Sequence, residues 1–243
     1  MFSGQLVSNV GVYDNGCELK ASELTFVHFL RIAGYRTALS GKGHFIGPDQ
    51  LHGFEERLTT DIYPSSFLWS PDWSDGVTLN YGSNVEQVHS SGVCRWSLQL
   101  DYDEETSFKA HEWLRSYARA SEQGDDRPFF LNVSFTHPHD PFIINEPWWD
   151  LYRDEDIPLP DARESTDELH QFNKWLQVHH GIHDFPVDEQ TTIAARRAFY
   201  GMCSYLDSLV GRLVGELKNL GLYENTVIIL PATMERCSEN TAC

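Results

Sequence analysis

Basic residues are scarce in this sequence. Lys and Arg together number 18 against 36 Asp and Glu, which gives a formal net charge of −18. Nucleic acids and anionic membranes are bound through basic patches, so this charge balance argues against both as partners. It favours a ligand with a cationic portion, and it still allows an anion in a locally basic pocket.

Long apolar runs are missing as well. No stretch of about 18 apolar residues occurs, so no transmembrane helix is predicted. Residues 1–10 lack both a cationic start and a long apolar core, so no signal peptide is visible and we expect a cytoplasmic protein. The five cysteines show neither CxxC spacing nor a metal-binding pattern, which is typical of reduced thiols.

What the sequence does contain predicts an α/β fold with a sizeable core. Apolar residues make up 41% of the 243 residues, which is typical of a globular chain. A helix is predicted over residues 22–33, capped by Ser22 and ended by Gly34. A strand over 35–39 and a glycine-rich turn over 41–44 follow it. This helix–strand–turn order is one unit of a parallel sheet.

Two longer helices and two further strands are predicted downstream. The helices cover residues 106–120 and 188–220, with Thr106 and Asp188 as their N-caps. The strands are buried apolar runs at Phe129–Phe135 and Thr226–Leu230. The stretch 48–103 shows no strong period and is rich in aromatic residues, which indicates either a substrate-facing lobe or aromatic side chains packed within loops. The stretch 142–187 is expected to be irregular.

The apolar run Phe129–Phe135 ends abruptly in His137-Pro-His139-Asp-Pro, which indicates a site. In an open α/β sheet, ligands bind beyond the carboxyl ends of the strands. Lys42 and His44 also follow a strand end, so we expect them to project on the same side. A Lys can neutralise a tetrahedral oxyanion, and a His can act as general acid to a leaving alkoxide. The alternative is a solvated Lys and turn histidines with ordinary structural partners.

The sequence also raises the possibility of a metal site and of an aromatic site for a cation. His137, His139 and Asp140 are close in sequence, but the prolines between them hinder chelation, so no self-contained metal site is expected. Trp69 and Trp73 offer an aromatic wall for a quaternary ammonium group through cation–π contact. Packing of these two tryptophans inside a loop is the alternative.

Several segments of the chain, in order, carry a resemblance to a known family. They are Gly11–Asn15, Ala33–Arg57, Asp61–Pro64, Pro71–Trp73, Ser134–Pro141 and Tyr200–Asp207. Together they resemble the type I sulfatases of the alkaline-phosphatase superfamily, most closely the choline-sulfatase branch, over roughly residues 2–230. The resemblance implies an alkaline-phosphatase-like α/β fold, a mixed sheet flanked by helices. It also implies sulfate-ester hydrolysis by a formylglycine residue with a divalent metal, usually Ca²⁺.

The resemblance also implies which residues are catalytic. Lys42 and His44 match the sulfate-binding Lys and the His of the family's G-K-x-H motif. His139 matches the second active-site His, which faces the ester oxygen and donates a proton there. His137 is then expected to be structural.

Three further residues are implied to bind the substrate. Asn15 falls on an active-site Asn near the nucleophile, and Trp69 and Asn84 fall where choline sulfatases line the substrate pocket. The implied substrate is a small sulfate ester with a cationic choline moiety, hydrolysed to choline and sulfate. No nucleic-acid or membrane partner is implied, and full-length members of the family can form oligomers.

The chain departs from the family at both ends. The modification motif C/S-x-P-x-R should precede the segment resembling Phe2–Leu6, yet none of the five cysteines has the required Pro and Arg after it. The family strand matching Val227–Leu230 continues into an S-D-H-G metal motif, where this chain has Ala232–Glu235. Thr and Met cannot replace Asp and His as ligands of a hard cation. The formylglycine residue and the Ca²⁺ ligands are therefore expected to be absent.

The expected architecture follows from these departures. Residues 1–230 are expected to form a partial sulfatase domain, with an incomplete sheet that lacks the first strand and the C-terminal part. Residues 231–243 are expected to be a non-homologous tail. The favoured function is a fragment of a sulfuric ester hydrolase without turnover. The alternatives are a phosphonate or phosphodiester hydrolase of the same superfamily and a non-catalytic binder of choline-type cations.

Overall fold

The computed structural model describes residues 2–63, 74, 76, 79, 84–160 and 169–231. The chain divides into two compact units. The first consists of Met1–Pro71, Leu98–Thr136 and Ser208–Asn225, and the second of Asp72–Ser97, His137–Asp207 and Thr226–Cys243.

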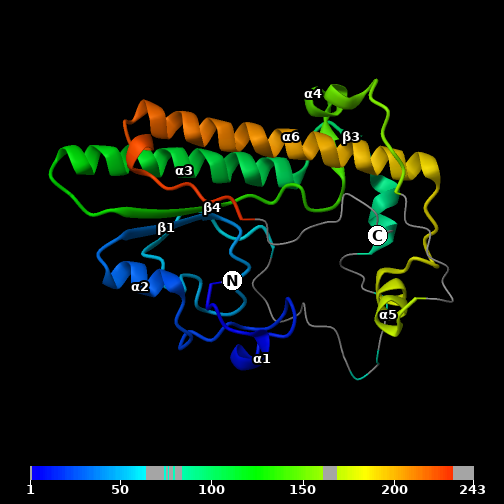
Figure 1. Cartoon of the computed structure of the whole chain (residues 1–243), viewed down its shortest axis with the longest axis horizontal. Coiled ribbons are helices and arrows are strands. Elements are labelled where there is room, and N and C mark those ends of the chain that lie inside the picture. The colour runs from blue at the N-terminus through cyan, green and yellow to red at the C-terminus, as the bar shows by residue number, and fades with distance from the viewer. Residues whose placement is uncertain are drawn as a thin grey trace. The chain divides into compact units, whose positions relative to one another are not determined.

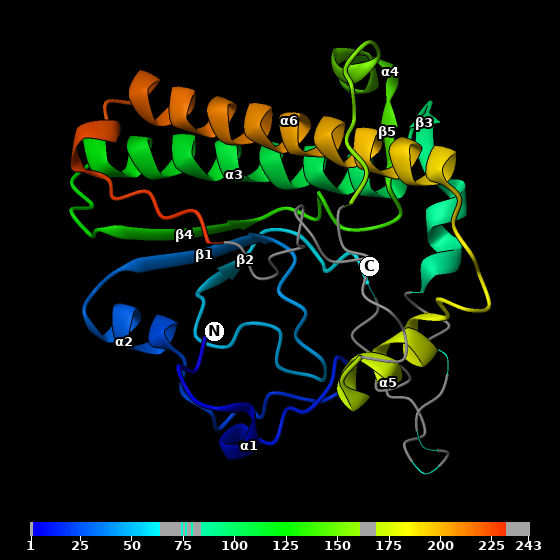
Figure 2. The ribbon, with the colours of Figure 1, turned by 45° about the vertical axis from the view of Figure 1, so that its right-hand side comes forward.

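The first unit is built on a three-stranded parallel sheet, so the predicted α/β class is confirmed. Its strands are β1 (Arg36–Gly41), β2 (Glu56–Arg57) and β4 (Phe129–Ser134), in the order β2-β1-β4 (Figures 1 and 2). Strand β1 lies in the middle and is buried from Thr37 onward, as its apolar and small residues predict. Gly41 lies opposite Ser134 in the register, so β1 and β4 end level with one another.

Helices cover both faces of this sheet. Helix α2 (Phe26–Ile32) lies on one face, below the strands in Figure 2, and α3 (Leu98–Glu122) lies on the other. Helix α6 (Glu189–Asn219) contributes its residues from Ser208 to the first unit, where Leu217 packs in one cluster with residues of α3. A single turn of helix, α1 (Val7–Val10), precedes α2, and a short 3-10 helix, η5 (Tyr223–Asn225), follows α6.

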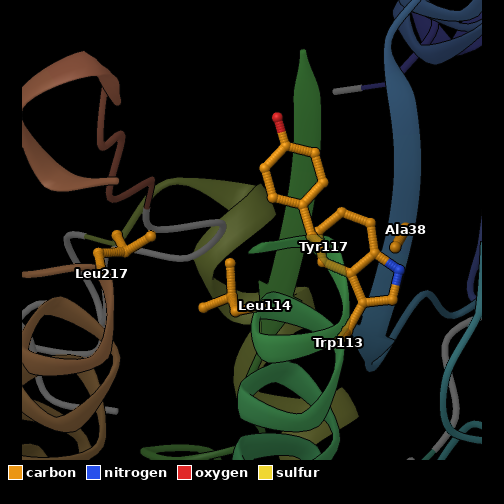
Figure 3. Packing of buried hydrophobic residues seen from close by; sticks show 5 residues of the cluster. All are labelled: Ala38, Trp113, Leu114, Tyr117 and Leu217. Carbon is orange, nitrogen blue, oxygen red and sulfur yellow. The ribbon is translucent and has the colours of Figure 1, made fainter. Parts of the chain in front are cut away.

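The core between α3 and the sheet is dominated by aromatic side chains. Trp113 is only 4% exposed and lies against Ala38 of β1, with Tyr117 stacked beside it at 5.8 Å between ring centroids (Figure 3). Leu114 lies on the side of α3 that faces Leu217 of α6, which closes the same cluster. Burying these side chains joins α3, β1 and α6 into one packed body.

The predicted ends of the first of these helices can be compared with the observed ends of α2. Helix α2 begins at Phe26 and not at residue 22, so the expected Ser22 cap is wrong. Its cap is Thr25, which forms a capping box with His28 and whose hydroxyl donates to the His52 carbonyl oxygen at 2.7 Å. The C-terminal prediction is confirmed, because Gly34 follows the helix with φ +92°.

The predicted N-cap is wrong for one of the two long helices and agrees with the structure for the other. Helix α3 begins at Leu98, and Thr106, the expected cap, is fully buried inside it. Polar side chains in the first turns are buried against the unit, and this burial extends the helix beyond its local start signal. Helix α6 begins where predicted, because the Asp188 carboxylate accepts a hydrogen bond from the Thr191 N–H at 2.7 Å.

The second unit has a two-stranded parallel pair, β3 (Gly92–Cys94) and β5 (Ile143–Asn145). The short helices beside it are η3 (Val85–Ser90), α4 (Glu146–Trp149), η4 (Asp150–Tyr152) and α5 (Gln171–His180). The prediction that residues 142–187 are irregular is therefore wrong for β5, α4, η4 and α5. Elements β5, α4 and η4 have only three or four residues, too few to show a period, whereas α5 does show one in Phe172, Trp175 and Leu176, which the prediction overlooks.

The predicted buried strand at Thr226–Leu230 is not observed. The segment has no regular structure, and Val227 and Ile229 are 87% and 80% exposed. A strand needs a neighbour to satisfy its N–H and C=O groups, and none of the strand pairings among the described residues involves this segment. In the described part of the chain, no helix is long and apolar enough to cross a membrane.

Candidate active site

The predicted residues Lys42 and His44 lie on the loop that follows β1. We call residues Gly41–His44, which begin with the last residue of β1, the Lys-His loop. Gly41 has φ +102°, and a Cβ added there would lie 2.0 Å from the Ser134 carbonyl oxygen, so only glycine fits. The Gly41 N–H donates to Thr59 Oγ1 at 2.8 Å, and the Lys42 N–H donates to the Ser134 carbonyl oxygen at 3.0 Å. The loop is therefore fixed at its first two residues.

The ammonium group of Lys42 lies over an aromatic ring. Lys42 Nζ is 4.8 Å from the centroid of the Tyr63 ring, which is a cation–π distance. Both residues are half-buried. This contact holds the positive charge near the end of β1, where the family resemblance implies a sulfate-binding Lys.

His44 adopts an unusual backbone conformation with φ +52°, in the left-handed region that non-glycine residues rarely enter. Its Nε2 lies 2.9 Å from the Asn15 carbonyl oxygen. A carbonyl oxygen can only accept, so Nε2 carries the hydrogen and donates it. The first unit thus brings the predicted residues Asn15 and His44 into contact, through the backbone carbonyl group of Asn15.

A buried carboxylate that the sequence reasoning did not assign lies behind this loop. Asp61 Oδ2 accepts hydrogen bonds from the N–H groups of Gly43 at 3.0 Å and His44 at 2.6 Å. It also pairs with Arg57 Nη2 at 3.0 Å. Asp61 belongs to the segment Asp61–Pro64 that carries part of the family resemblance, but no local pattern in the sequence marks its carboxylate as a partner of the loop.

Helix α3 anchors the Thr59–Tyr63 segment from the other side. The Tyr102 hydroxyl donates to the Thr60 carbonyl oxygen at 2.9 Å. Burial raises the pKa of Tyr102 to about 12, and the negative charge of Asp61 acts in the same direction. The phenol therefore keeps its proton at neutral pH and remains a donor to the segment.

The two histidines after β4 belong to the second unit and differ in environment. His137 is 3% exposed, and its ring lies edge-on to Tyr205 at 4.9 Å between centroids. The His139 side chain is 25% exposed, and its Nδ1 lies 3.1 Å from Asp140 Oδ1 and 2.9 Å from the Asp140 carbonyl oxygen. An imidazole beside a carboxylate, partly open to solvent, has the surroundings of a proton donor.

The other two residues predicted to bind the substrate are Asn84 and Trp69. Asn84 is buried and caps η3, because its Oδ1 accepts from the Glu86 N–H at 2.9 Å. Its substrate contact stays a prediction. Trp69 lies outside the described residues, as does Trp73.

The described residues do not fit a divalent metal. A Ca²⁺ ion takes six to eight oxygen ligands, with several carboxylates among them. No group of three or more His, Cys, Asp or Glu side chains that could hold a metal occurs in the ranges given above. Asp61, beside the Lys-His loop, already uses Oδ2 for two backbone N–H groups and Arg57. No step of the chemistry is therefore assigned to a metal on this chain.

Comparison with known proteins defines the class. A sequence model of the Sulfatase family matches residues 1–232. The chain is 42% identical to a choline-sulfatase of Rhizobium meliloti (strain 1021) over 230 residues, which is 93% of this chain and 45% of that protein. It is 24% identical to an arylsulfatase of Clostridium perfringens (strain 13 / Type A) over 81% of this chain and 43% of that protein.

The solved structures agree at the level of the fold. A phosphonate monoester hydrolase from Silicibacter pomeroyi superposes with a TM-score of 0.59 and 20% identity, covering 92% of this chain and 49% of that one. The chain belongs to the Sulfatase family, with the α/β fold of the sulfatases and phosphonate hydrolases. It is similar to choline sulfatase, and it spans less than half the length of the relatives named here.

Proposed function

We propose that this chain binds a small sulfate ester with a cationic choline-type moiety, and that it does not hydrolyse this ester by itself. The observation that carries the binding proposal is the Lys-His loop. Its two cationic or donor side chains, Lys42 and His44, lie on one short loop at the end of a central parallel strand. The 42% identity to a choline-sulfatase supports the choice of ester.

The roles follow from the chemistry of each group. The Lys42 ammonium neutralises the sulfate oxyanion. The Nε2–H of His44 donates to the Asn15 carbonyl oxygen in the free chain, and we propose that it exchanges this acceptor for the oxyanion when the ester binds. On the resemblance alone, His139 matches the residue that donates a proton to the leaving alkoxide in complete members of the family. We assign the quaternary ammonium of choline to aromatic contacts of Trp69, on the resemblance alone.

The absence of turnover is proposed from the sequence. No proline of the chain has a cysteine or serine two positions before it, so no C/S-x-P-x-R motif is present to supply formylglycine. In the family this residue supplies the nucleophile and Ca²⁺ stabilises the ester charge. Without such groups, most transition-state stabilisation is lost. Cys17, Cys94 and Cys203 carry free thiols, which supports the proposal of a reducing, cytoplasmic compartment.

Calorimetric titration of the 243-residue chain with choline-O-sulfate tests the proposal. Binding should weaken about tenfold or more in Lys42→Ala, because a charge-assisted contact contributes about 1.5–3 kcal/mol. Lys20→Ala removes an exposed lysine of the same unit and is the matched control. Sulfate release with Ca²⁺ present should not exceed that of His139→Ala.

Two alternatives give different results in the same titration. A methyl phosphonate monoester that binds more tightly than choline-O-sulfate would favour a phosphonate or phosphodiester ligand, as the structural neighbour suggests. Choline alone binding as well as its sulfate, with no effect of Lys42→Ala, would favour a simple cation binder. Turnover above the His139→Ala control would refute the proposed inactivity.

A further inference from the structure

Alternate residues of one short segment contact every residue of the Lys-His loop. Thr59 Oγ1 accepts from the Gly41 N–H, Asp61 Oδ2 accepts from the N–H groups of Gly43 and His44, and the Tyr63 ring lies under Lys42 Nζ. Of the three, Asp61 alone bonds two successive residues of the loop. A single oxygen that accepts from both N–H groups requires the backbone to curve around it.

The conformation that Asp61 supports is an unfavourable one for histidine. A non-glycine residue at φ +52° is strained, and such a residue persists only where its surroundings over-determine it. His44 is held at its N–H by Asp61 and at its ring by the Asn15 carbonyl oxygen. Without the Asp61 acceptor, the loop is free to relax to a conformation in which Lys42 and His44 no longer face one ligand.

Burial and charge explain how a carboxylate can serve this role beside an anion site. The side chains of Asp61 and Arg57 are only 4% and 9% exposed, and their ion pair is 3.0 Å long. Arg57 also donates to Gln50 and to the Thr59 carbonyl oxygen, so it is held firmly against Asp61. The Arg57 charge offsets that of Asp61, which would otherwise oppose an oxyanion at the loop.

We propose that Asp61 is the positioning residue of the anion site: its Oδ2 holds the N–H groups of Gly43 and His44 and thereby sets the placement of Lys42 and His44. This inference rests on the proposed sulfate binding. The role depends on where the oxygen lies and not on its charge. Two conservative substitutions of Asp61 can therefore separate the position of the oxygen from its charge, because each changes one of these and keeps the other.

Asp61→Asn keeps an oxygen at the Oδ2 position and removes the charge. Its NH₂ group takes the place of Oδ1, which has no hydrogen-bond partner among the described residues. Asp61→Glu keeps the charge and moves the oxygen by one methylene. Asp49→Asn is the matched control, because Asp49 also accepts from two backbone N–H groups, those of Leu51 and His52, outside the Lys-His loop.

The experiment titrates the full chain with inorganic sulfate and follows backbone amide and Cα signals by NMR. Positioning predicts that Asp61→Asn and Asp49→Asn bind sulfate within about threefold of the wild type, whereas Asp61→Glu binds about tenfold more weakly. The His44 Cα signal, which reports its left-handed φ, should move in Asp61→Glu alone. Thermal unfolding of each variant shows whether affinity merely follows stability.

The opposite order of sulfate affinities in the two Asp61 variants would overturn the inference. If Asp61→Glu binds like the wild type while Asp61→Asn loses affinity, the charge matters and the position does not. If Asp49→Asn weakens sulfate binding as much as Asp61→Glu does, the loss of affinity reflects general destabilisation of the fold. If the wild type and Lys42→Ala both fail to bind sulfate, the proposed function is refuted, and the His44 Cα signal then decides on positioning by itself.

Discussion

Trp113→Ala is expected to be among the most destabilising substitutions in this chain. Trp113 joins α3 to the sheet: its ring stacks on Tyr117, meets Phe129 edge-on at 5.9 Å and lies under the Arg36 guanidinium at 5.4 Å. Its indole N–H donates to Glu56 Oε1 at 2.9 Å. Removing the side chain leaves a cavity between a long helix and the central strand.

The magnitude comes from packing more than from the hydrogen bond. A buried Trp covers about 150–250 Å², which at about 25 cal/mol per Å² corresponds to about 4–6 kcal/mol. Large-to-small substitutions of this kind cost about 3–5 kcal/mol. The Glu56 side chain is 43% exposed, so water replaces the lost donor. We expect about 4 kcal/mol for Trp113→Ala and about 2 kcal/mol for Trp113→Phe, which keeps one aromatic ring but loses the N–H donor and part of the packed indole.

Urea unfolding of the full chain, followed by circular dichroism, measures this loss. Phe108→Ala is the matched control, since Phe108 lies on the same helix but is 62% exposed. It should change the free energy of unfolding by less than about 0.5 kcal/mol. Equal shifts of the unfolding midpoint in Trp113→Ala and Phe108→Ala would refute the assignment of Trp113 to the core.

Two further predictions concern the loops around the site. Gly41→Ala should unfold at lower urea than Gly34→Ala: both glycines have positive φ, but only at Gly41 does an added Cβ meet backbone atoms. Equal losses would contradict the close approach to β4. Burial lowers the pKa of His52 below 6.5, against the opposing effect of the Asp49 charge. Below pH 6.5 the unfolded chain therefore takes up a proton that the folded chain does not, and stability should fall by at most about 1.4 kcal/mol per pH unit. His52→Phe should lack this component, and an identical pH profile in that variant would disprove it.

Local signals predict strands β1 and β4 and two helix ends, but not strand β2. Strand β4 follows from a short apolar run, and β1 follows from the helix–strand–turn order around residues 35–39. The start of α6 and the end of α2 follow from Asp188 and Gly34. These features depend on neighbours within a few residues, which the sequence displays directly. The early start of α3 was missed because burial against the unit, and not a cap, decides it.

The residues of the candidate site also differ in whether local sequence or distant contacts reveal them. Lys42 and His44 were identified because strand, glycines and charged residues adjoin in the sequence. The role of Asp61 was missed because its hydrogen bonds join residues 17 and 18 positions apart. The exposed segment Thr226–Leu230 shows the converse, since an apolar run is not a strand without a neighbouring strand.

The order of residues was thus enough to indicate the α/β class, the sulfatase resemblance and the loop that carries Lys42 and His44. It could not reveal that His44 is held in a left-handed conformation between the Asn15 carbonyl oxygen and a buried carboxylate paired with Arg57. Local conformational preference is a property of a few adjacent residues. The placement of a hydrogen-bond acceptor is settled only when distant segments pack together and exclude water.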